Sequence, residues 1–159
     1  MNDKKPWFEV VAIPALLRHA RVTYGMAMSR ALAEAGYDDM PKNGMYIIGG
    51  MSLETGEIPL GQLIKELRVS KQAAGQLVDT LVLRGYLKRD EDPDDRRKSN
   101  ITLTKRGRAA AEIQAAARKK IDAQLIERVG NEDILRTRRT LAALIDMGQE
   151  TERADPGEN

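Results

Sequence analysis

The sequence of 159 residues contains no cysteine and a single histidine, His19. The lack of cysteine excludes disulfides, thiol nucleophiles, thiolate metal sites and thiol-based redox sensing. A histidine-rich metal centre is excluded by the histidine count. Because no glycine-rich phosphate motif is present either, we expect no enzyme activity, and therefore no catalytic residue, no metal and no cofactor.

Aromatic residues are also scarce, at 4% of the chain, although hydrophobic residues make up 42% and charged residues 31%. A core poor in aromatics and rich in Ala, Leu, Ile and Met favours packed helices over a β-sandwich. No apolar run approaches the roughly 18 residues that a membrane span needs. The N-terminal stretch Trp7–Leu17 is interrupted by Glu9 and Pro14 and does not look like a signal peptide. We therefore expect a cytoplasmic protein with no membrane partner.

Basic charge is concentrated in the middle of the chain. Between Leu60 and Arg108 there are 12 Lys and Arg against 7 Asp and Glu, a net charge of +5, whereas the rest holds 14 against 17, a net charge of −3. This distribution is expected if only the middle contacts a polyanion. Charge can also fall unevenly without any function, so the charge count alone leaves both interpretations open.

The N-terminal third is predicted to be helical after a short arm. Residues 1–10 show no pattern, and we interpret them as the arm. Over 13–35, apolar or small side chains recur every three or four residues, which predicts a helix that ends before Gly36. A shorter apolar segment, 45–53, follows. The pair Gly49–Gly50 inside it argues against a regular helix, since each glycine costs roughly 1 kcal/mol relative to alanine.

Two further helices are predicted with a short turn between them. The segments 60–67 and 71–84 both carry apolar residues at helical spacing. Ser70 offers a hydroxyl that caps the second of these helices, and Gly85 suits the position just past its end. A helix, a turn of three or four residues and a second capped helix predict a helix-turn-helix.

A hairpin is predicted directly after the second helix. The short segments 86–89 and 101–103 read as strands, and the polar segment 90–100 between them, which contains Pro93, reads as a loop. Two strands joined by a charged loop in this position form the wing of a winged helix-turn-helix.

The C-terminal part is predicted to form two helices, over 104–129 and 132–147, separated by Gly130. The terminal helices have more apolar surface than the wing domain can cover, which favours a two-fold dimer. We therefore predict a mostly α-helical fold with a small β-hairpin wing, in which dimerisation helices flank a winged helix-turn-helix. The expected domains are an N-terminal arm (1–10), dimerisation helices (11–36 and 104–148), a winged helix-turn-helix DNA-binding domain (41–103) and a disordered tail (149–159).

The middle of the sequence resembles the MarR family of bacterial transcriptional regulators. The resemblance is carried by Leu63–Arg89, by the segment Asp92–Lys98 and by Ile101–Gly107. The wing signature of the family, Asp-x-Arg followed after a short gap by Leu-Thr-x-x-Gly, fits Asp95-Arg96-Arg97 and Leu103–Gly107. The similarity covers roughly residues 11–148. It implies a homodimeric, DNA-binding regulator, most often a repressor.

The start of the second helix is the expected DNA-reading element, because the N-terminal turn of this helix enters the major groove in such motifs. Ser70 and the free N–H groups of the first turn would face a phosphate. Glutamine can bond adenine edges and lysine can reach guanine, while a small residue such as Ala73 can approach a thymine methyl. The alternative is an ordinary solvated first turn. The residues expected to contact DNA here are Ser70, Lys71, Gln72, Ala73 and Gln76.

The tip of the wing is the second expected contact with DNA. Arg96, Arg97 and Lys98 can enter the minor groove, where arginine favours a narrow, electronegative stretch. Asp95 can hold Arg97 extended through a charge-assisted pair. In proteins that resemble this family, the residue matching Arg97 enters the groove and the one matching Asp95 orients it. The alternative is a solvated loop of mixed charge that binds nothing.

A ligand site is expected from the resemblance alone. Regulators of this kind often bind small aromatic acids in a cleft between the dimerisation helices and the wing domain, and His19 lies on the first predicted helix. The alternative for His19 is a partly buried histidine whose hydrogen bonds are satisfied. The candidate lining residues are Leu16, His19, Met45 and Tyr46, with Arg89 as a possible partner for a carboxylate.

The sequence thus predicts a homodimer that binds a pseudo-palindromic operator in double-stranded DNA, with release by a small aromatic or phenolic effector. The alternative is a winged-helix module that docks another protein without binding DNA. A steep dependence of duplex binding on salt would distinguish the two, because neutralising phosphates makes affinity fall with the logarithm of salt concentration.

Overall fold

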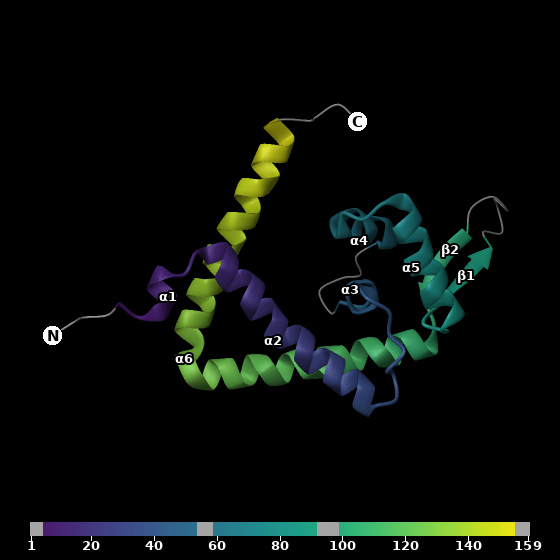
Figure 1. Cartoon of the computed structure of the whole chain (residues 1–159), viewed down its shortest axis with the longest axis horizontal. Coiled ribbons are helices and arrows are strands. Elements are labelled where there is room, and N and C mark those ends of the chain that lie inside the picture. The colour runs from purple at the N-terminus through teal and green to yellow at the C-terminus, as the bar shows by residue number, and fades with distance from the viewer. Residues whose placement is uncertain (1–4, 54–58, 92–98, 155–159) are drawn as a thin grey trace. The chain divides into compact units, whose positions relative to one another are not determined.

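The computed structural model of the chain describes residues 5–53, 59–91 and 99–154. Figure 1 shows helices with one two-stranded hairpin, so the predicted mostly α-helical fold class with a β-hairpin wing is confirmed. None of the described helices combines the length and apolarity needed to cross a bilayer. The elements are α1 (Trp7–Val10), α2 (Ile13–Glu34), α3 (Gly44–Gly50), α4 (Leu60–Leu67), α5 (Lys71–Leu83), β1 (Leu87–Glu91), β2 (Ser99–Leu103) and α6 (Lys105–Ala154).

The chain divides into two compact units, Met1–Lys119 and Lys120–Asn159. The first unit contains the hydrophobic core, to which α2, α3, α4, α5, the hairpin and the first turns of α6 contribute. Full burial of one large aliphatic side chain contributes roughly 1.5–3 kcal/mol, so this core accounts for the stability of the unit. The core residues are Leu32, Ile47, Ile48, Met51, Leu63, Leu81, Tyr86, Leu87, Leu103, Ala110 and Ala111.

Helix α3 contains both Gly49 and Gly50, the residues whose low helical propensity weakened the case for a regular helix in the sequence. A Cβ on Gly50 would lie 2.4 Å from Cδ2 of Leu63 on α4, and one on Gly49 would lie 3.0 Å from Oε1 of Gln114 on α6. The two glycines therefore let α3 approach its neighbours closely. Tight packing on both sides offsets the low helical propensity of glycine.

The turn between α4 and α5 follows the predicted pattern. Arg68 ends α4 in the left-handed conformation with φ of 51°. The hydroxyl of Ser70 then accepts a hydrogen bond from the N–H of Ala73 at 3.1 Å, which confirms the predicted N-cap of α5. At the other end, Gly85 has φ of 77°, a conformation that glycine adopts without steric cost.

The hairpin is longer than predicted. Strands β1 and β2 pair antiparallel, in a register that runs from Leu87 opposite Leu103 to Glu91 opposite Ser99. The polar residues at both ends of the predicted loop 90–100 therefore belong to strands, and Tyr86 precedes β1 and is buried in the core instead. Period-2 apolar patterning could not reveal strand residues that are polar throughout.

The ends of the chain also differ from the predictions. The N-terminal arm contains one helical turn, α1. The two predicted C-terminal helices, in contrast, are both present: α6 consists of two helices that meet in a kink at Gly130, where φ of 81° and ψ of 162° are not helical. The second of them continues to Ala154, so residues 149–154 are helical where a disordered tail was expected.

Candidate nucleic-acid interface

Helix α5 presents two contrasting sides. Ala74, Val78 and Leu81 are buried against the core, at the spacing of one helical face. The other side is open to solvent. It carries two charged residues, Lys71 and Asp79, and its remaining residues are uncharged. The sequence-predicted residues on this open side are Lys71, Gln72, Ala73 and Gln76, and all four are exposed.

Ser70 is exposed as well, but its hydroxyl is engaged in capping. The cap satisfies the N–H of Ala73 and leaves the first amides of α5 without a partner inside the helix. An anion at this end would be stabilised by those amides and by the helix dipole. Ser70 therefore shapes the end of α5 that the sequence analysis assigned to a phosphate.

The base of the hairpin pairs its own acidic residues with basic ones. Lys88 forms an ion pair with Asp90 at 3.1 Å, and the hydroxyl of Thr102 donates to the same carboxylate at 3.0 Å. These contacts, that of Lys88 first, lower the pKa of Asp90 below its usual range. Arg89 forms an ion pair with Asp79 of α5, which connects β1 to that helix. Pairing thus offsets the repulsion that these carboxylates would exert on DNA.

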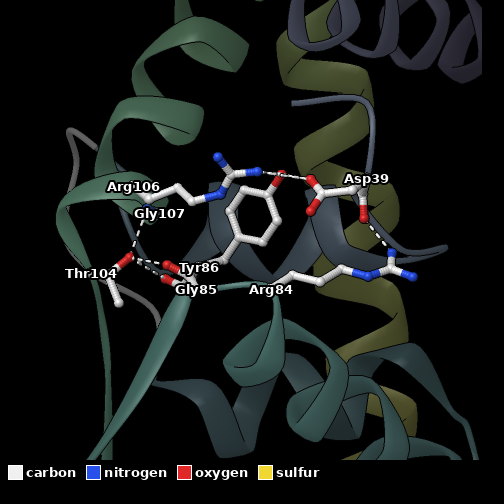
Figure 2. Close-up of polar contacts among 7 residues, drawn as sticks. All are labelled: Asp39, Arg84, Gly85, Tyr86, Thr104, Arg106 and Gly107. Atoms are coloured by element: carbon white, nitrogen blue, oxygen red, sulfur yellow. Dashed lines mark hydrogen bonds and ion pairs between the residues drawn. The ribbon is translucent and has the colours of Figure 1, made fainter. Parts of the chain in front are cut away.

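A cluster of four side chains joins α5, the hairpin and α6 to the segment after α2 (Figure 2). Tyr86 donates a hydrogen bond to the carboxylate of Asp39, and Arg106 forms an ion pair with that carboxylate at 2.9 Å. Arg84 donates to the backbone carbonyl of Asp39. We refer to Asp39, Arg84, Tyr86 and Arg106 as the Asp39 cluster. It fixes the end of α5 and the start of the hairpin relative to the first turn of α6.

Two aromatic rings stabilise the arginine of the Asp39 cluster. The guanidinium of Arg106 lies 4.9 Å from the ring centroid of Tyr37 and 4.7 Å from that of Tyr86, within cation–π range. Burial, reinforced by the hydrogen bond to Asp39, raises the pKa of Tyr86 to about 12. The hydrogen bond from Tyr86, with the charge of Arg106, lowers the pKa of Asp39. At neutral pH the cluster therefore contains a neutral phenol, a carboxylate and a guanidinium.

The Leu-Thr-x-x-Gly motif has a structural explanation beside this cluster. The hydroxyl of Thr104 donates to the carbonyl of Gly85 at 2.5 Å and accepts from the N–H of Gly107 at 3.0 Å, so it caps α6 and holds it to the start of the hairpin (Figure 2). A Cβ on Gly107 would lie 2.2 Å from the carbonyl oxygen of Tyr86. Only glycine lets α6 approach the hairpin this closely.

The remaining sequence-predicted contacts at the wing lie outside the described residues. They are Asp95, Arg96, Arg97 and Lys98.

The residues predicted for a ligand site are spread over different contacts. His19 is exposed on α2, and Leu16 is half-buried there. Met45 lines a hollow of about 330 Å³ beside α2, whereas Tyr46 donates a hydrogen bond to Glu66 of α4. Arg89 is paired with Asp79. The exposure of His19 in this chain taken alone does not match the alternative of a partly buried histidine. Of the five side chains, the hollow beside α2 contains only Met45, and a second hollow, beside α5, contains none.

Sequence reasoning missed the Asp39 cluster. The ion pair between Asp39 and Arg106 joins residues 67 positions apart, and no short-range pattern links them. The signal that was available was the Leu-Thr-x-x-Gly motif, which places Arg106 next to Gly107. Among the described residues there is no group of three or more His, Cys, Asp or Glu that could hold a metal ion.

Solved structures share this fold. A complex of FabT from Streptococcus pneumoniae with DNA has a TM-score of 0.67 at 19% identity, covering 88% of this chain and 99% of that one. RV1404 from Mycobacterium tuberculosis has a TM-score of 0.64 at 25% identity, covering 91% and 96%. A complex of MepR from Staphylococcus aureus with DNA has a TM-score of 0.64 at 16% identity, covering 86% and 98%.

A comparison with curated protein sequences gives no match. The model of the MarR family, in contrast, matches residues 48–98, which extend from α3 through α4 and α5 to the segment after β1. This is the region in which the sequence carries its resemblance and in which the structure builds the helix-turn-helix and the hairpin. Residues 48–98 are thus similar to the MarR family, and the chain shares the fold of FabT and RV1404.

Proposed function

We propose that the chain is a cytoplasmic, homodimeric transcription regulator that binds double-stranded DNA in a sequence-specific manner. The observation that carries the proposal is the open side of α5, where Lys71, Gln72 and Gln76 are exposed on a helix fixed from behind by the core. Lysine and glutamine are the side chains that read guanine and adenine edges in the major groove. The complexes of FabT and MepR with DNA support the proposal.

Exposed apolar side chains support the homodimer. Trp7 is 69% exposed in the N-terminal arm, and in the second unit Ile145 is 60% and Met147 63% exposed. Large apolar side chains that face water in one protomer are usually covered in the assembly. We infer that α2 and α6, with the arm, form the contact between two copies. Sedimentation equilibrium tests this directly, and a monomer at micromolar concentration would contradict it.

The dimer sets the form of the operator. Two copies related by a two-fold axis place their α5 helices in successive major grooves about one helical turn apart, which requires a pseudo-palindrome. In this proposal the hairpin tips, with Arg97 oriented by Asp95 and aided by Arg96 and Lys98, contact the flanking minor grooves. Selection from random duplexes, followed by sequencing, would reveal the two half-sites and their spacing.

Two substitutions test the two contacts separately. Arg97→Ala should weaken binding to all duplexes, because it removes a cation from the minor groove. Gln76→Ala should instead change the preferred base at one position of each half-site, since its amide reads a base edge. Binding that is unaffected by Arg97→Ala would show that the wing has been assigned wrongly.

Whether the dimer represses or activates transcription is proposed from the resemblance to the family. We propose that the dimer represses transcription and that a small aromatic or phenolic ligand releases it, by favouring another spacing of the two α5 helices. A reporter gene under the selected operator should be silent with the protein and active when such a ligand is added. A ligand screen in which no compound of this class lowers DNA affinity would contradict release.

One observation favours the alternative, a winged helix that docks another protein. Leu83 at the end of α5 is 87% exposed, which is unusual for a large apolar side chain. Leu83→Ser would abolish such docking and leave DNA binding almost unchanged. Duplex affinity that does not fall as salt rises would favour this alternative over the regulator.

A further inference from the structure

A groove of about 370 Å³ runs beside α5 in the first unit. One wall is α5 together with Val69, and the other is the end of the segment that connects α2 to α3. The groove is lined by Pro41, Lys42, Asn43, Val69, Ala73, Gln76, Leu77 and Thr80.

The lining has the chemistry of a site for an anion attached to an apolar body. It contains one cation, Lys42, and no carboxylate. Pro41 and Leu77 supply apolar surface, and Asn43 and Gln76 supply neutral polar groups. Lys42 is exposed, and no carboxylate of the described residues forms an ion pair with it. A phosphate joined to a deoxyribose matches this combination of charge and apolar surface.

The groove is continuous with the proposed DNA-reading side of α5. Ala73 and Gln76 belong to both surfaces. A helix is about 10–12 Å in diameter and the major groove is about 12 Å wide, so an inserted helix fills the groove. Whatever flanks the inserted helix must then face the sugar-phosphate strand at the edge of the groove. The segment Pro41–Asn43 flanks α5 in this way.

We propose that Lys42 contacts a backbone phosphate of the DNA strand that borders the major groove occupied by α5. The deoxyribose next to that phosphate lies against Pro41 and Leu77. This contact rests on the proposed function and adds to it a third DNA-binding element, separate from α5 and from the wing. It positions the duplex without reading its sequence, as phosphate contacts do.

The test is the salt dependence of binding to a fluorescently labelled mixed-sequence duplex. Lys42→Ala should weaken binding to every duplex alike, and should reduce the slope of log affinity against log salt by about one for each protomer bound. Lys42→Arg is the matched control, because it keeps one positive charge at the same exposed position of the groove. It should leave the slope unchanged. Thermal unfolding of both variants checks that the fold is intact.

A second measurement locates the phosphate. In the operator selected by the wild-type protein, single phosphates are replaced one at a time by neutral methylphosphonates. One position in each half-site should weaken wild-type binding and have no further effect on Lys42→Ala, because the substitution has already removed its partner. Independent effects of the two changes at every position would overturn the contact.

The outcomes separate this inference from the function on which it rests. If wild-type binding depends steeply on salt and Lys42→Ala has the wild-type slope, the Lys42 contact is wrong and the regulator stands. If the wild-type protein shows no salt-dependent binding to duplex DNA, the proposed function itself fails. If Lys42→Ala abolishes binding of benzoate in calorimetry while the slope is unchanged, the groove takes a small acid instead, which also overturns the contact.

Discussion

The two units of the chain differ in how many of their side chains are buried. The first unit buries its core, and α6 contributes to it through Gly107, Ala110, Ala111 and Gln114. In the second unit, none of the described residues is buried, although the same helix continues there with many apolar side chains. A sequence can therefore form one continuous helix whose two parts depend on different partners. The first part packs against the core of its own unit, and the second presents exposed apolar side chains.

The largest expected effect is at Gly107, where the first unit is most tightly packed. Gly107→Ala places a Cβ 2.2 Å from the carbonyl oxygen of Tyr86, so it should lower the free energy of unfolding by about 3 kcal/mol or more. Gly148→Ala is the matched control in the second unit, where a Cβ meets nothing within 4 Å. It should stabilise the helix by up to about 1 kcal/mol. Urea unfolding measures both, and equal effects would remove the contrast between the units.

The next effect tests whether the second unit needs a partner copy. The double variant Leu144→Glu and Ile145→Glu should weaken the homodimer more than tenfold, because charges would be buried in the contact without partners. The helix content measured by circular dichroism should change little, because the core of the first unit is not altered. Arg139→Glu, a change at an exposed polar position, is the control. A dimer of unchanged strength in sedimentation equilibrium would show that these side chains face water in solution.

A smaller effect compares ion pairs in the two units. A double-mutant cycle with Asp39→Asn and Arg106→Gln should give a coupling of about 1 kcal/mol, reduced by the partial exposure of both side chains. The exposed pair Glu132–Arg136 should couple by only about 0.3–0.5 kcal/mol, the range of i,i+4 pairs on helices. Coupling at Asp39 that is no larger than at Glu132 would mean that the Asp39 cluster adds no stability.

The pH dependence of the Asp39 cluster sharpens the same comparison. The pKa of Asp39 is lowered in the folded chain, so the stabilisation is present above the unfolded pKa of about 3.9 and is lost as pH falls through the folded value. Asp39→Asn should therefore flatten the decline in stability below about pH 4. Calorimetric unfolding between acid and neutral pH measures this. A decline of the same steepness in wild type and variant would contradict it.

An effect about as large as the coupling between Asp39 and Arg106 is expected at the phenol of Tyr86. Its pKa is raised to about 12, so the stabilisation is complete below the unfolded pKa of about 10 and is lost as pH rises toward 12. Tyr86→Phe should remove one ionisation near pH 12 from the ultraviolet titration and cost about 1 kcal/mol. Tyr46→Phe, which removes the other phenol with a pKa near 12, is the control outside the cluster. If Tyr86→Phe leaves the ionisation near pH 12 unchanged, the phenol of Tyr86 faces water in the wild-type protein.

Helices and their ends could be predicted where local chemistry determines them. The N-cap at Ser70 depends on one hydroxyl and one backbone amide three residues away, and the end of α2 before Gly36 depends on the conformational freedom of glycine. Both signals lie within a few residues of the feature that they predict. The exposed side of α5 followed from its apolar period for the same reason.

Features that depend on distant residues could not be predicted. Nothing near Gly49 in the sequence reveals that Gln114 packs against it, so the sequence could not establish the helix there. The groove beside α5 and the Asp39 cluster likewise join segments from different parts of the chain. The part of the candidate site on α5 could therefore be predicted, but the residues around α5 could not. Spacing in the sequence says little about which segments pack against each other.

The kink at Gly130 limits which amino acids this position can hold. With φ of 81° and ψ of 162°, that residue occupies a region of backbone space open almost exclusively to glycine. Any side chain introduced there would strain this backbone conformation, and relieving the strain would change the direction of the helix that follows. A single substitution at Gly130 could thus redirect residues 131–154 together, although none of them is itself changed.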